Sequence, residues 1–521
     1  MSKRLKNIGI VSFLTVVSRF LGLFRDQLAA AIFGAGALYS AFVTAFIIPN
    51  LFRRLLAEGS LNAAFVPTLQ GELHEKGKPG AFALLSNVVS WLLLVTGGLT
   101  VLACVVLSRS RLLAGHEAKW YIAADLSVLL FPYLALISLA AAFNAALNVM
   151  EHFTEPALSP IWLNIAMIVT LGGAGLHYAH TPMGEIHWLC AGVLIGGFFQ
   201  MGVPAVVLFS EGWRPRFDLG LPPRVKEIAL LMTPGLFGTA IYQINISVSR
   251  FLAFSLDDSS ATLYFYGNRL MEFPIGVFAI AISTVVYPLL SRHAVVGDFK
   301  SMAEDYRKGL RLILVINVPA ALGLVLLSHP ITNVIYRHGL FTSQNANDLA
   351  TMVALFSIGM PFFSIVNLTI RAFYSFRDTA TPVRIAAIDF VVNIMVSLSL
   401  MHWLGVDGLV IASTTAIVVQ TILLQLALAR RLPGMSFRPL WPSLGKVALG
   451  TTVMGVAVWL GWTFIRSLPA TPFAAGLIAI FTLIPLAVGI YAGMLWILRI
   501  EGREELVEMF RRNKAGKIAS R

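Results

Sequence analysis

Residues 18–59 read SRFLGLFRDQLAAAIFGAGALYSAFVTAFIIPNLFRRLLAEG. Two apolar runs meet here at a glycine-rich turn, Gly34–Gly36. Charged residues lie inside or at the ends of both runs: Arg19, Arg25, Asp26, Arg53, Arg54 and Glu58. An arginine near the middle of a membrane helix costs about 2.5–3.5 kcal/mol, so a chain keeps one where it faces a wet cavity or an anionic ligand. The stretch therefore predicts membrane helices that line a cavity for an anion.

The composition of the whole chain also indicates a membrane protein. Of its 521 residues, 57% are hydrophobic and only 12% are charged, about half the charged fraction of a soluble domain. The formal net charge is +13. The basic residues lie in short connections between apolar runs, which is typical of the positive-inside rule, so we expect no nucleic-acid partner. Cys104 and Cys190 both lie inside apolar runs and predict neither a disulfide framework nor a metal site.

Apolar runs follow one another along the chain. A helical span needs about 20 mostly apolar residues, and these runs are too long and too evenly apolar for the strands of a barrel. We expect an all-α polytopic membrane protein with about fourteen transmembrane helices. The expected spans are residues 7–32, 37–57, 80–107, 121–149, 157–178, 186–209, 227–255, 261–291, 308–328, 346–375, 382–404, 408–429, 443–465 and 473–498.

Alternate connections between these spans differ in their content of lysine and arginine. The richer set includes Lys76, Lys78, Arg214 and Arg224, and the poorer set includes Arg337. Basic connections stay in the cytoplasm. Both termini are therefore expected in the cytoplasm.

Short patterns recur in the same order at a separation of roughly 220 residues, as in transporters built from two related halves. Arg53 to Glu58 precedes a Val-Pro pair, and Arg269 to Glu272 precedes a Tyr-Pro pair. We expect two pseudo-symmetric six-helix lobes around a central cavity, followed by two extra helices and a cytoplasmic tail. The expected boundaries are 1–222 for the first lobe, 223–435 for the second, 436–498 for the extra helices and 499–521 for the tail.

The charges inside the expected spans allow two interpretations. Arg19 and Asp26 lie nearly on one helix face, and Arg269 and Glu272 are spaced to neutralise each other in part. The charges would then be internal ion pairs, or arginines that reach the membrane interface. We favour an anion site, because cations outnumber carboxylates inside the spans and arginine binds phosphate oxygens through two parallel hydrogen bonds.

A second group of polar residues is a candidate ion site. Asp389 and Asn393 lie one helical turn apart, and Asn245 lies in an earlier span. Oxygen ligands of this type suit a sodium ion or a titrating proton, but a hydrogen bond between buried helices explains them equally well. No nucleophile motif, phosphate loop or metalloprotease helix is present, so we expect neither an enzyme nor a catalytic metal.

Four motifs carry a family resemblance. They are SRxLGxxRD (Ser18–Asp26), PNLxRRxxAEG (Pro49–Gly59), AFVP (Ala64–Pro67) and NRLMEFPxG (Asn268–Gly276). Together they resemble the MurJ/MviN family of lipid II flippases, which belongs to the superfamily that also holds the MATE drug exporters. The resemblance covers nearly the whole chain.

The resemblance implies two lobes around a cationic cavity. The implied cargo is lipid II, the undecaprenyl-diphosphate-linked disaccharide-pentapeptide from which peptidoglycan is built. The last two helices would form a hydrophobic groove for its polyprenyl tail. By motif match, the implied substrate site consists of Arg19, Arg25, Arg53 and Arg269 with the carboxylates Asp26, Glu58 and Glu272.

The sequence also departs from the family pattern. Ser40 stands where some members carry aspartate, Asn268 where the motif often has aspartate, and Thr262 where some carry serine. The family's sodium site matches here only at Asn393, with Ser397 and Ser413 nearby. The coupling ion, Na⁺ or H⁺, therefore stays open.

We expect a multi-pass protein of the bacterial cytoplasmic (inner) membrane that flips lipid II to the outer leaflet by alternating access. Arg19, Arg25 and Arg269 would bind the diphosphate, and Arg53 would guide its entry. A membrane potential that is negative inside favours outward movement of an anion. The alternatives are a flippase for another polyprenyl-linked glycan, a drug exporter, and a scaffold that binds lipid precursors for cell-wall synthesis proteins without moving them.

Overall fold

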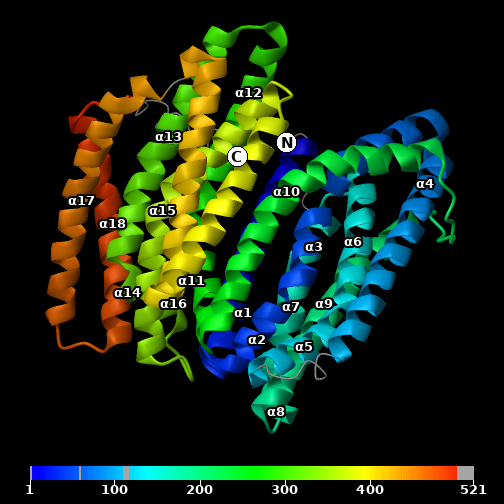
Figure 1. Cartoon of the computed structure of the whole chain (residues 1–521), viewed down its shortest axis with the longest axis horizontal. Coiled ribbons are helices and arrows are strands. Elements are labelled where there is room, and N and C mark those ends of the chain that lie inside the picture. Colours follow the sequence, from blue (N-terminus) through cyan, green and yellow to red (C-terminus); the bar gives the residue numbers. More distant parts are fainter. Residues whose placement is uncertain (1–2, 58–59, 110–116, 436, 502–521) are drawn as a thin grey trace. The chain divides into compact units, whose positions relative to one another are not determined.

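The computed structural model describes residues 3–57, 60–109, 117–435 and 437–501. Every regular element in this part of the chain is a helix (Figure 1), which confirms the predicted all-α fold. Ten of the described helical stretches are long and apolar enough to cross a membrane. The chain divides into two compact units, which are Met1–Thr262 with His338–Leu340, and Leu263–Arg337 with Phe341–Arg521.

The first unit contains the helices up to α10. Their bounds are α1 Lys3–Phe33, α2 Ala37–Ala45, α3 Ile47–Ala57, α4 Ser60–Ser108, α5 Ala118–Leu130, α6 Pro132–Val149, α7 Thr154–Val169, the π-helical η2 Thr170–Gly175, α8 Leu176–Tyr178, α9 Pro182–Ser210 and α10 Pro223–Leu256.

The turn between α1 and α2 requires glycine. Gly34 has φ +62°, and a Cβ atom there would lie 2.7 Å from the main-chain oxygen of Leu340. The amide of Leu340 in turn donates to the carbonyl of Ala31 at 2.8 Å. The predicted turn at Gly34–Gly36 is therefore present. The run that follows it forms two helices, α2 and α3, because α2 ends at the C-cap Phe46.

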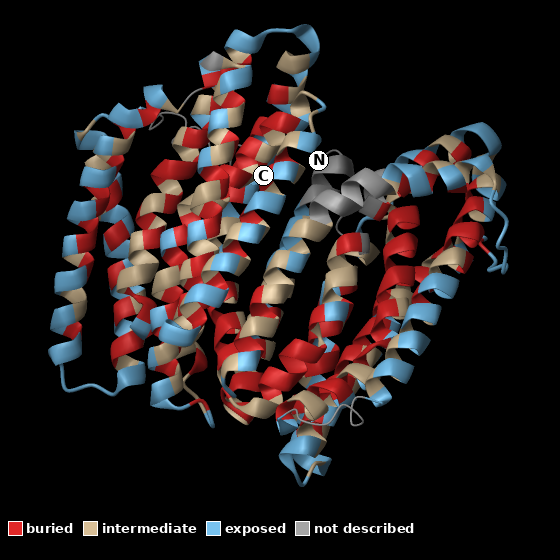
Figure 2. Ribbon diagram, in the orientation of Figure 1, coloured by how far each residue is buried: buried red, intermediate tan, exposed pale blue. Residues whose placement is uncertain are grey.

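The core of the first unit lies where α4 packs on α6 and α10. Phe65, Leu85 and Phe143 are buried there with Trp213, and the indole nitrogen of Trp213 donates to Ser86 Oγ at 3.0 Å. Figure 2 shows the buried residues along the facing sides of α4 and α6. This core joins the N-terminal part of α4 to the segment that leads into α10.

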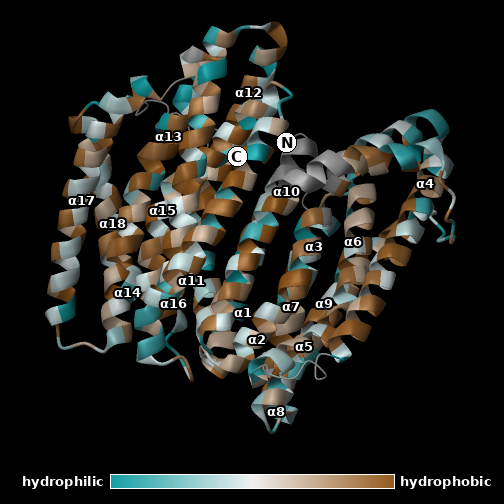
Figure 3. Ribbon diagram, viewed as in Figure 1, coloured by the Kyte–Doolittle hydropathy of each residue, from teal (hydrophilic) through white to brown (hydrophobic). Residues whose placement is uncertain are grey.

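A kink at Gly77 (φ +66°) divides α4 into two parts. The part before the kink ends with a polar segment that includes Glu72, Glu75 and Lys76, and Figure 3 shows hydrophilic residues gathered at this bend. The part after the kink exposes large apolar side chains such as Leu94, Val101 and Val106. A surface of that kind suits contact with lipid.

The second unit contains most of α11, from Leu263 onward, and the helices that follow it. Their bounds are α11 Ser260–Pro274, the π-helical η3 Ile275–Ala279, α12 Ile280–Val296, α13 Phe299–Leu326, α14 Ser328–Tyr336, α15 Ser343–Ser375, α16 Ala380–Arg431, the 3₁₀ turns η4 Pro433–Met435 and η5 Arg438–Leu440, α17 Trp441–Ser467 and α18 Pro472–Ile497. One core joins α12, α13, α15 and α16, and a second joins α13, α14, α17 and α18.

The predicted number of fourteen spans and the predicted lobe boundaries stay predictions. Two predicted spans, 382–404 and 408–429, lie in α16, which Gly405 (φ +56°, ψ −136°) divides into two helices. The predicted lobe boundary at residue 222 is based on the internal sequence repeat, whereas the two units are defined by contacts between residues. By packing, α10 belongs to the first unit, because it contacts α3 and α4.

Candidate functional site

The face of α1 that carries Ser18, Gly22 and Arg25 packs on α7. These positions are spaced four and three residues apart, so they lie on one side of the helix. Gly22 is buried between the other two. The sequence therefore places an arginine, a small residue and an accessible main-chain carbonyl along one interhelical contact.

Arg25 and Asp26 form an ion pair at this contact. Nε and Nη2 of Arg25 both donate to Oδ1 of Asp26, at 3.0 and 2.6 Å. The side chain of Arg25 is 13% exposed and that of Asp26 is 0% exposed. The interpretation of an internal ion pair, which the sequence left open, thus holds in part, because the structure brings these two predicted site residues together.

Arg25 is also bonded to α7, which the sequence analysis missed. Its Nη1 donates to Asn164 Oδ1 at 3.1 Å and lies 3.6 Å from Sδ of Met167. The side-chain nitrogen Nδ2 of Asn164 donates to the main-chain carbonyl of Ser18 at 3.1 Å. The only signal in the sequence is a lone asparagine in an apolar run, since a polar group within a membrane span needs a partner.

The other predicted arginines of the first unit lie on α1 and α3. Arg19 is half-buried on α1. Arg53 is half-buried on α3, where its Nε donates to Asn50 Oδ1 at 3.0 Å. Glu58, which the family resemblance places in the substrate site, lies outside the described residues.

Arg269 and Glu272 lie on α11 in the second unit, and both are half-buried. Oε1 of Glu272 accepts a hydrogen bond from Asn268 Nδ2 at 3.2 Å. The residue that departs from the family motif, Asn268, is therefore bonded to a carboxylate of that motif. An aspartate at position 268 would repel Glu272 instead.

The candidate ion site divides between the two units. Asp389 and Asn393 are buried on α16 in the second unit, and Asn245 is half-buried on α10 in the first. Ser413 Oγ lies 3.5 Å from Asn393 Oδ1 and 3.1 Å from the hydroxyl of Tyr264. Tyr264 is a member of this polar group that the sequence analysis missed. The described residues contain no group of three His, Cys, Asp or Glu side chains that could hold a metal ion.

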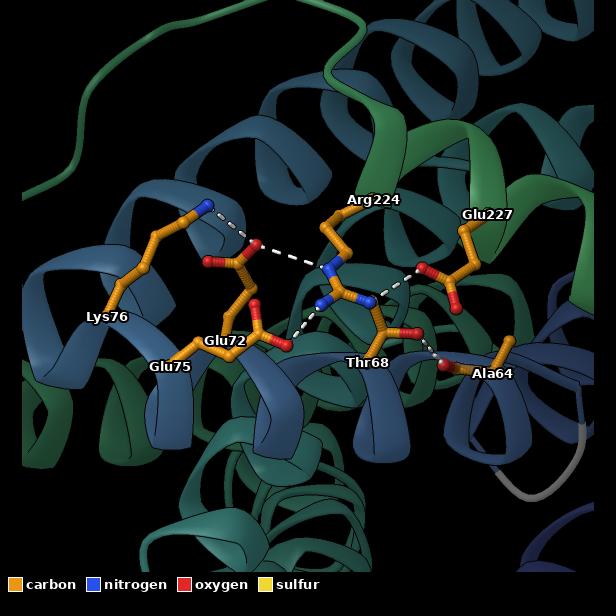
Figure 4. Close-up of polar contacts among 7 residues, drawn as sticks. All are labelled: Ala64, Thr68, Glu72, Glu75, Lys76, Arg224 and Glu227. Carbon is orange, nitrogen blue, oxygen red and sulfur yellow. Dashed lines mark hydrogen bonds and ion pairs between the residues drawn. The ribbon is translucent and has the colours of Figure 1, made fainter.

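Arg224, at the start of α10 in the first unit, is another arginine with several partners. It contacts three carboxylates (Figure 4). Its nitrogens lie 2.7 Å from Glu75, 3.1 Å from Glu227 and 3.4 Å from Glu72. Lys76 adds a contact of 3.1 Å to Glu72. Hydrogen bonds to Glu75 and Glu227 raise the pKa of Arg224. This group, the Arg224 cluster, joins the segment of α4 before Gly77 to α10.

Comparisons with known proteins place the chain in a family. The family model described as "Lipid II flippase MurJ" matches residues 29–507. The "Probable lipid II flippase MurJ" of Vibrio cholerae is 33% identical over 488 residues, which cover 88% of this chain and 91% of that protein. The "Lipid II flippase MurJ" of Burkholderia cenocepacia is 29% identical over 507 residues, which cover 94% of this chain and 96% of that protein.

Solved structures show the same fold. The structure titled "Lipid II flippase MurJ, inward closed conformation" superposes with a TM-score of 0.75 at 23% identity, covering 94% of this chain and 99% of that one. An inward-facing multidrug resistance MATE family transporter superposes with a TM-score of 0.67 at 13% identity, covering 81% of this chain and 98% of that one. With ten apolar helical stretches among the described residues, the chain is a multi-pass membrane protein, and the family that it matches is one of flippases rather than enzymes. It belongs to the lipid II flippase MurJ family.

Proposed function

We propose that this protein moves lipid II from the cytoplasmic to the outer leaflet of the bacterial inner membrane by alternating access. Family membership supports the cargo, because its relatives are named lipid II flippases. The proposed cytoplasmic location of both termini rests on the positive-inside rule. It is supported by the first unit, where two of the basic connections lie together through Lys78 with Glu211 and Arg224 with Glu72.

The physical problem is the passage of a charged head group through about 30 Å of hydrocarbon. An isolated charge that leaves water for such a medium costs tens of kcal/mol by Born estimates. Guanidinium groups offset this cost, because they replace lost water with charge-assisted hydrogen bonds to phosphate oxygens. The polyprenyl tail remains among the lipid chains, so only the head group needs a polar path.

The observation that carries the proposal concerns Arg25 on α1. Its guanidinium is largely buried and is bonded to Asp26 and Asn164. An arginine costs free energy in a membrane helix, and its planar donors match a diphosphate. Arg19 and Arg269 are proposed to bind the diphosphate with Arg25, and Arg53 to guide entry. The proposed carboxylates of the same site are Asp26, Glu58 and Glu272.

Lipids and ions complete the proposal. The pair α17 and α18 exposes large apolar side chains, among them Phe464, Phe481 and Val488, which suit a polyprenyl tail. Asn245, Asp389 and Asn393 are proposed to hold a coupling ion, Na⁺ or H⁺, and the membrane potential to favour outward movement. Cell-wall synthesis proteins that use the exported lipid are proposed partners.

Vesicles that contain lipid II with a labelled head group test the function. The wild-type protein should make the head group accessible to an impermeant reagent on the opposite side. Arg25→Ala and Arg269→Ala should abolish this exchange while the folded protein remains in the membrane. Because Arg25→Ala leaves Asp26 buried, Arg25→Ala/Asp26→Asn is needed beside it.

The control is Ser159→Ala, which removes a hydrogen bond between α7 and α9 (3.3 Å from Gln200 Nε2) at a distance from Arg25 along α7. It should exchange lipid II at the wild-type rate. Normal exchange by both arginine variants would overturn the assignment of the diphosphate site. Wild-type protein that binds lipid II without exchanging it would be a scaffold, and faster exchange of another polyprenyl-linked glycan would change the cargo.

A further inference from the structure

The side chain of Asn164 connects α7 to two positions on α1. Its oxygen accepts from Arg25 Nη1 at 3.1 Å, and its nitrogen donates to the carbonyl of Ser18 at 3.1 Å. We infer that Asn164 is a positioning residue, which holds the guanidinium plane of Arg25 in the orientation that binds the cargo's diphosphate. The inference rests on the function proposed above for Arg25.

The two partners of Asn164 determine which way its amide faces. A guanidinium only donates hydrogen bonds, and a main-chain carbonyl only accepts them. If the amide were reversed, donors would face donors at Arg25 and oxygen would face oxygen at Ser18. Only one orientation of the Asn164 amide therefore satisfies both partners. Because the main-chain carbonyl of Ser18 sets this orientation, the side-chain oxygen of Asn164 is the atom that faces Arg25.

Arg25 is held through all three nitrogens of its guanidinium. Asp26 accepts from Nε and Nη2, whereas Asn164 accepts from Nη1. Rotation of the plane would break at least one of these contacts. The two partners also differ in charge, because Asp26 offsets the positive charge of Arg25 and the neutral Asn164 leaves it unchanged. Asn164 can therefore fix the direction of the group without weakening its attraction for an anion.

The direction of the plane matters because arginine binds phosphate oxygens through parallel N–H groups. A binding group that must first be oriented loses part of its interaction free energy to that ordering. Loss of one hydrogen bond to a charged group should weaken the affinity for lipid II roughly five- to twentyfold. Asn164→Asp should weaken it as well, because a carboxylate cannot donate to Ser18 and would neutralise Arg25 further.

A double-mutant cycle with the purified full-length protein tests the inference through the dissociation constant of lipid II. Arg25→Lys keeps the positive charge but has no plane to orient, so binding remains measurable. Asn164→Ala should weaken binding roughly five- to twentyfold in the wild type and less than about twofold in Arg25→Lys, because the residues act as one unit. Ser159→Ala, on the same helix, should leave the dissociation constant unchanged.

Each outcome has a separate meaning. If Asn164→Ala weakens binding equally in both backgrounds, Asn164 has a general structural role and the inference is wrong. It is also wrong if Asn164→Ala or Asn164→Asp binds lipid II as tightly as the wild type while Arg25→Ala does not. If Arg25→Ala itself binds with wild-type affinity, the proposed function of Arg25 fails, and the role of Asn164 fails with it.

Discussion

Arg224 and Arg25 are both bonded to several partners within the first unit, but their partners differ. Arg224 contacts three carboxylates, one from its own helix α10 and two from α4. Arg25 contacts the carboxylate of its neighbour Asp26 and the neutral amide of Asn164. The side chain of Arg224 is 31% exposed, and that of Arg25 is 13% exposed. Among the contacts described, the more exposed Arg224 has three acidic partners and the more buried Arg25 has one.

The difference separates two uses of the same side chain. A cation surrounded by carboxylates attracts them and so stabilises the contact between the helices that carry them. The Arg224 cluster should therefore contribute to the stability of the fold. A largely buried cation whose described partners on a second helix are the neutral side chains of Asn164 and Met167 keeps more of its attraction for an external anion. The Arg25 contact should therefore contribute to transport. Variants that keep the charge but change the cation or its position can test this distinction, because a structural cation tolerates such a change and a ligand-binding cation does not.

The largest expected effect is at Arg25. The swap Arg25→Asp/Asp26→Arg keeps the charges of the pair but moves the guanidinium to a neighbouring position on the helix. We expect lipid II exchange in vesicles to fall by at least about a hundredfold, because the phosphate contact needs a charge-assisted, oriented donor. Restored exchange in the swapped protein would show that Arg25 acts only as a partner of Asp26.

A smaller effect, on stability, is expected at the Arg224 cluster. Arg224→Ala leaves Glu72, whose side chain is 5% exposed, beside Glu75 and Glu227 without the shared cation. The melting temperature in detergent should fall by a few degrees, and less at high salt, because ions screen exposed charges. Arg224→Lys, which keeps a cation beside the three carboxylates, should recover most of the loss, and lipid II affinity should stay within about twofold in all three proteins. If Arg224→Lys is no more stable than Arg224→Ala, the role of the cluster is not electrostatic.

The overall fold follows from local features of the sequence. Long apolar runs predict membrane helices because no other element satisfies the backbone in lipid. The turn at Gly34 is visible because glycine tolerates its positive φ. The break at Gly405 follows the same rule, because its positive φ divides α16 into two helices. The predicted separation of 382–404 from 408–429 agrees with this break.

The candidate site could be predicted only in part. Arg25 is conspicuous because a charge in an apolar run is costly wherever it lies. Its partner Asn164 is 139 residues away in the sequence, and Glu75 is 149 residues from Arg224. Neither pairing has a periodicity that could indicate it, since both depend on which helices become neighbours. Packing between helices thus decides how a visible charge is used.

The smallest expected effect is a pH dependence of stability at Glu211, which contacts α4 at Lys78, next to the kink at Gly77. This residue follows α9 and accepts hydrogen bonds from Lys78 at 2.7 Å and His152 at 3.2 Å. The bonds from Lys78 and His152 lower the pKa of Glu211 below its ordinary value of 4.5. A carboxylate with a lowered pKa in the folded state adds stability above its ordinary pKa, and this stability is lost as the pH falls through the lowered value.

Glu211→Gln should therefore lower the free energy of unfolding at pH 7 by at most about 1 kcal/mol, because the pair is partly exposed and screened. The difference in melting temperature between the wild type and the variant should disappear as the pH falls below 4.5. Glu304→Gln, at an exposed position of α13, supplies the background for loss of one carboxylate. A difference that persists at low pH would mean that Glu211 acts through packing, and the comparison of charged groups would then not extend to it.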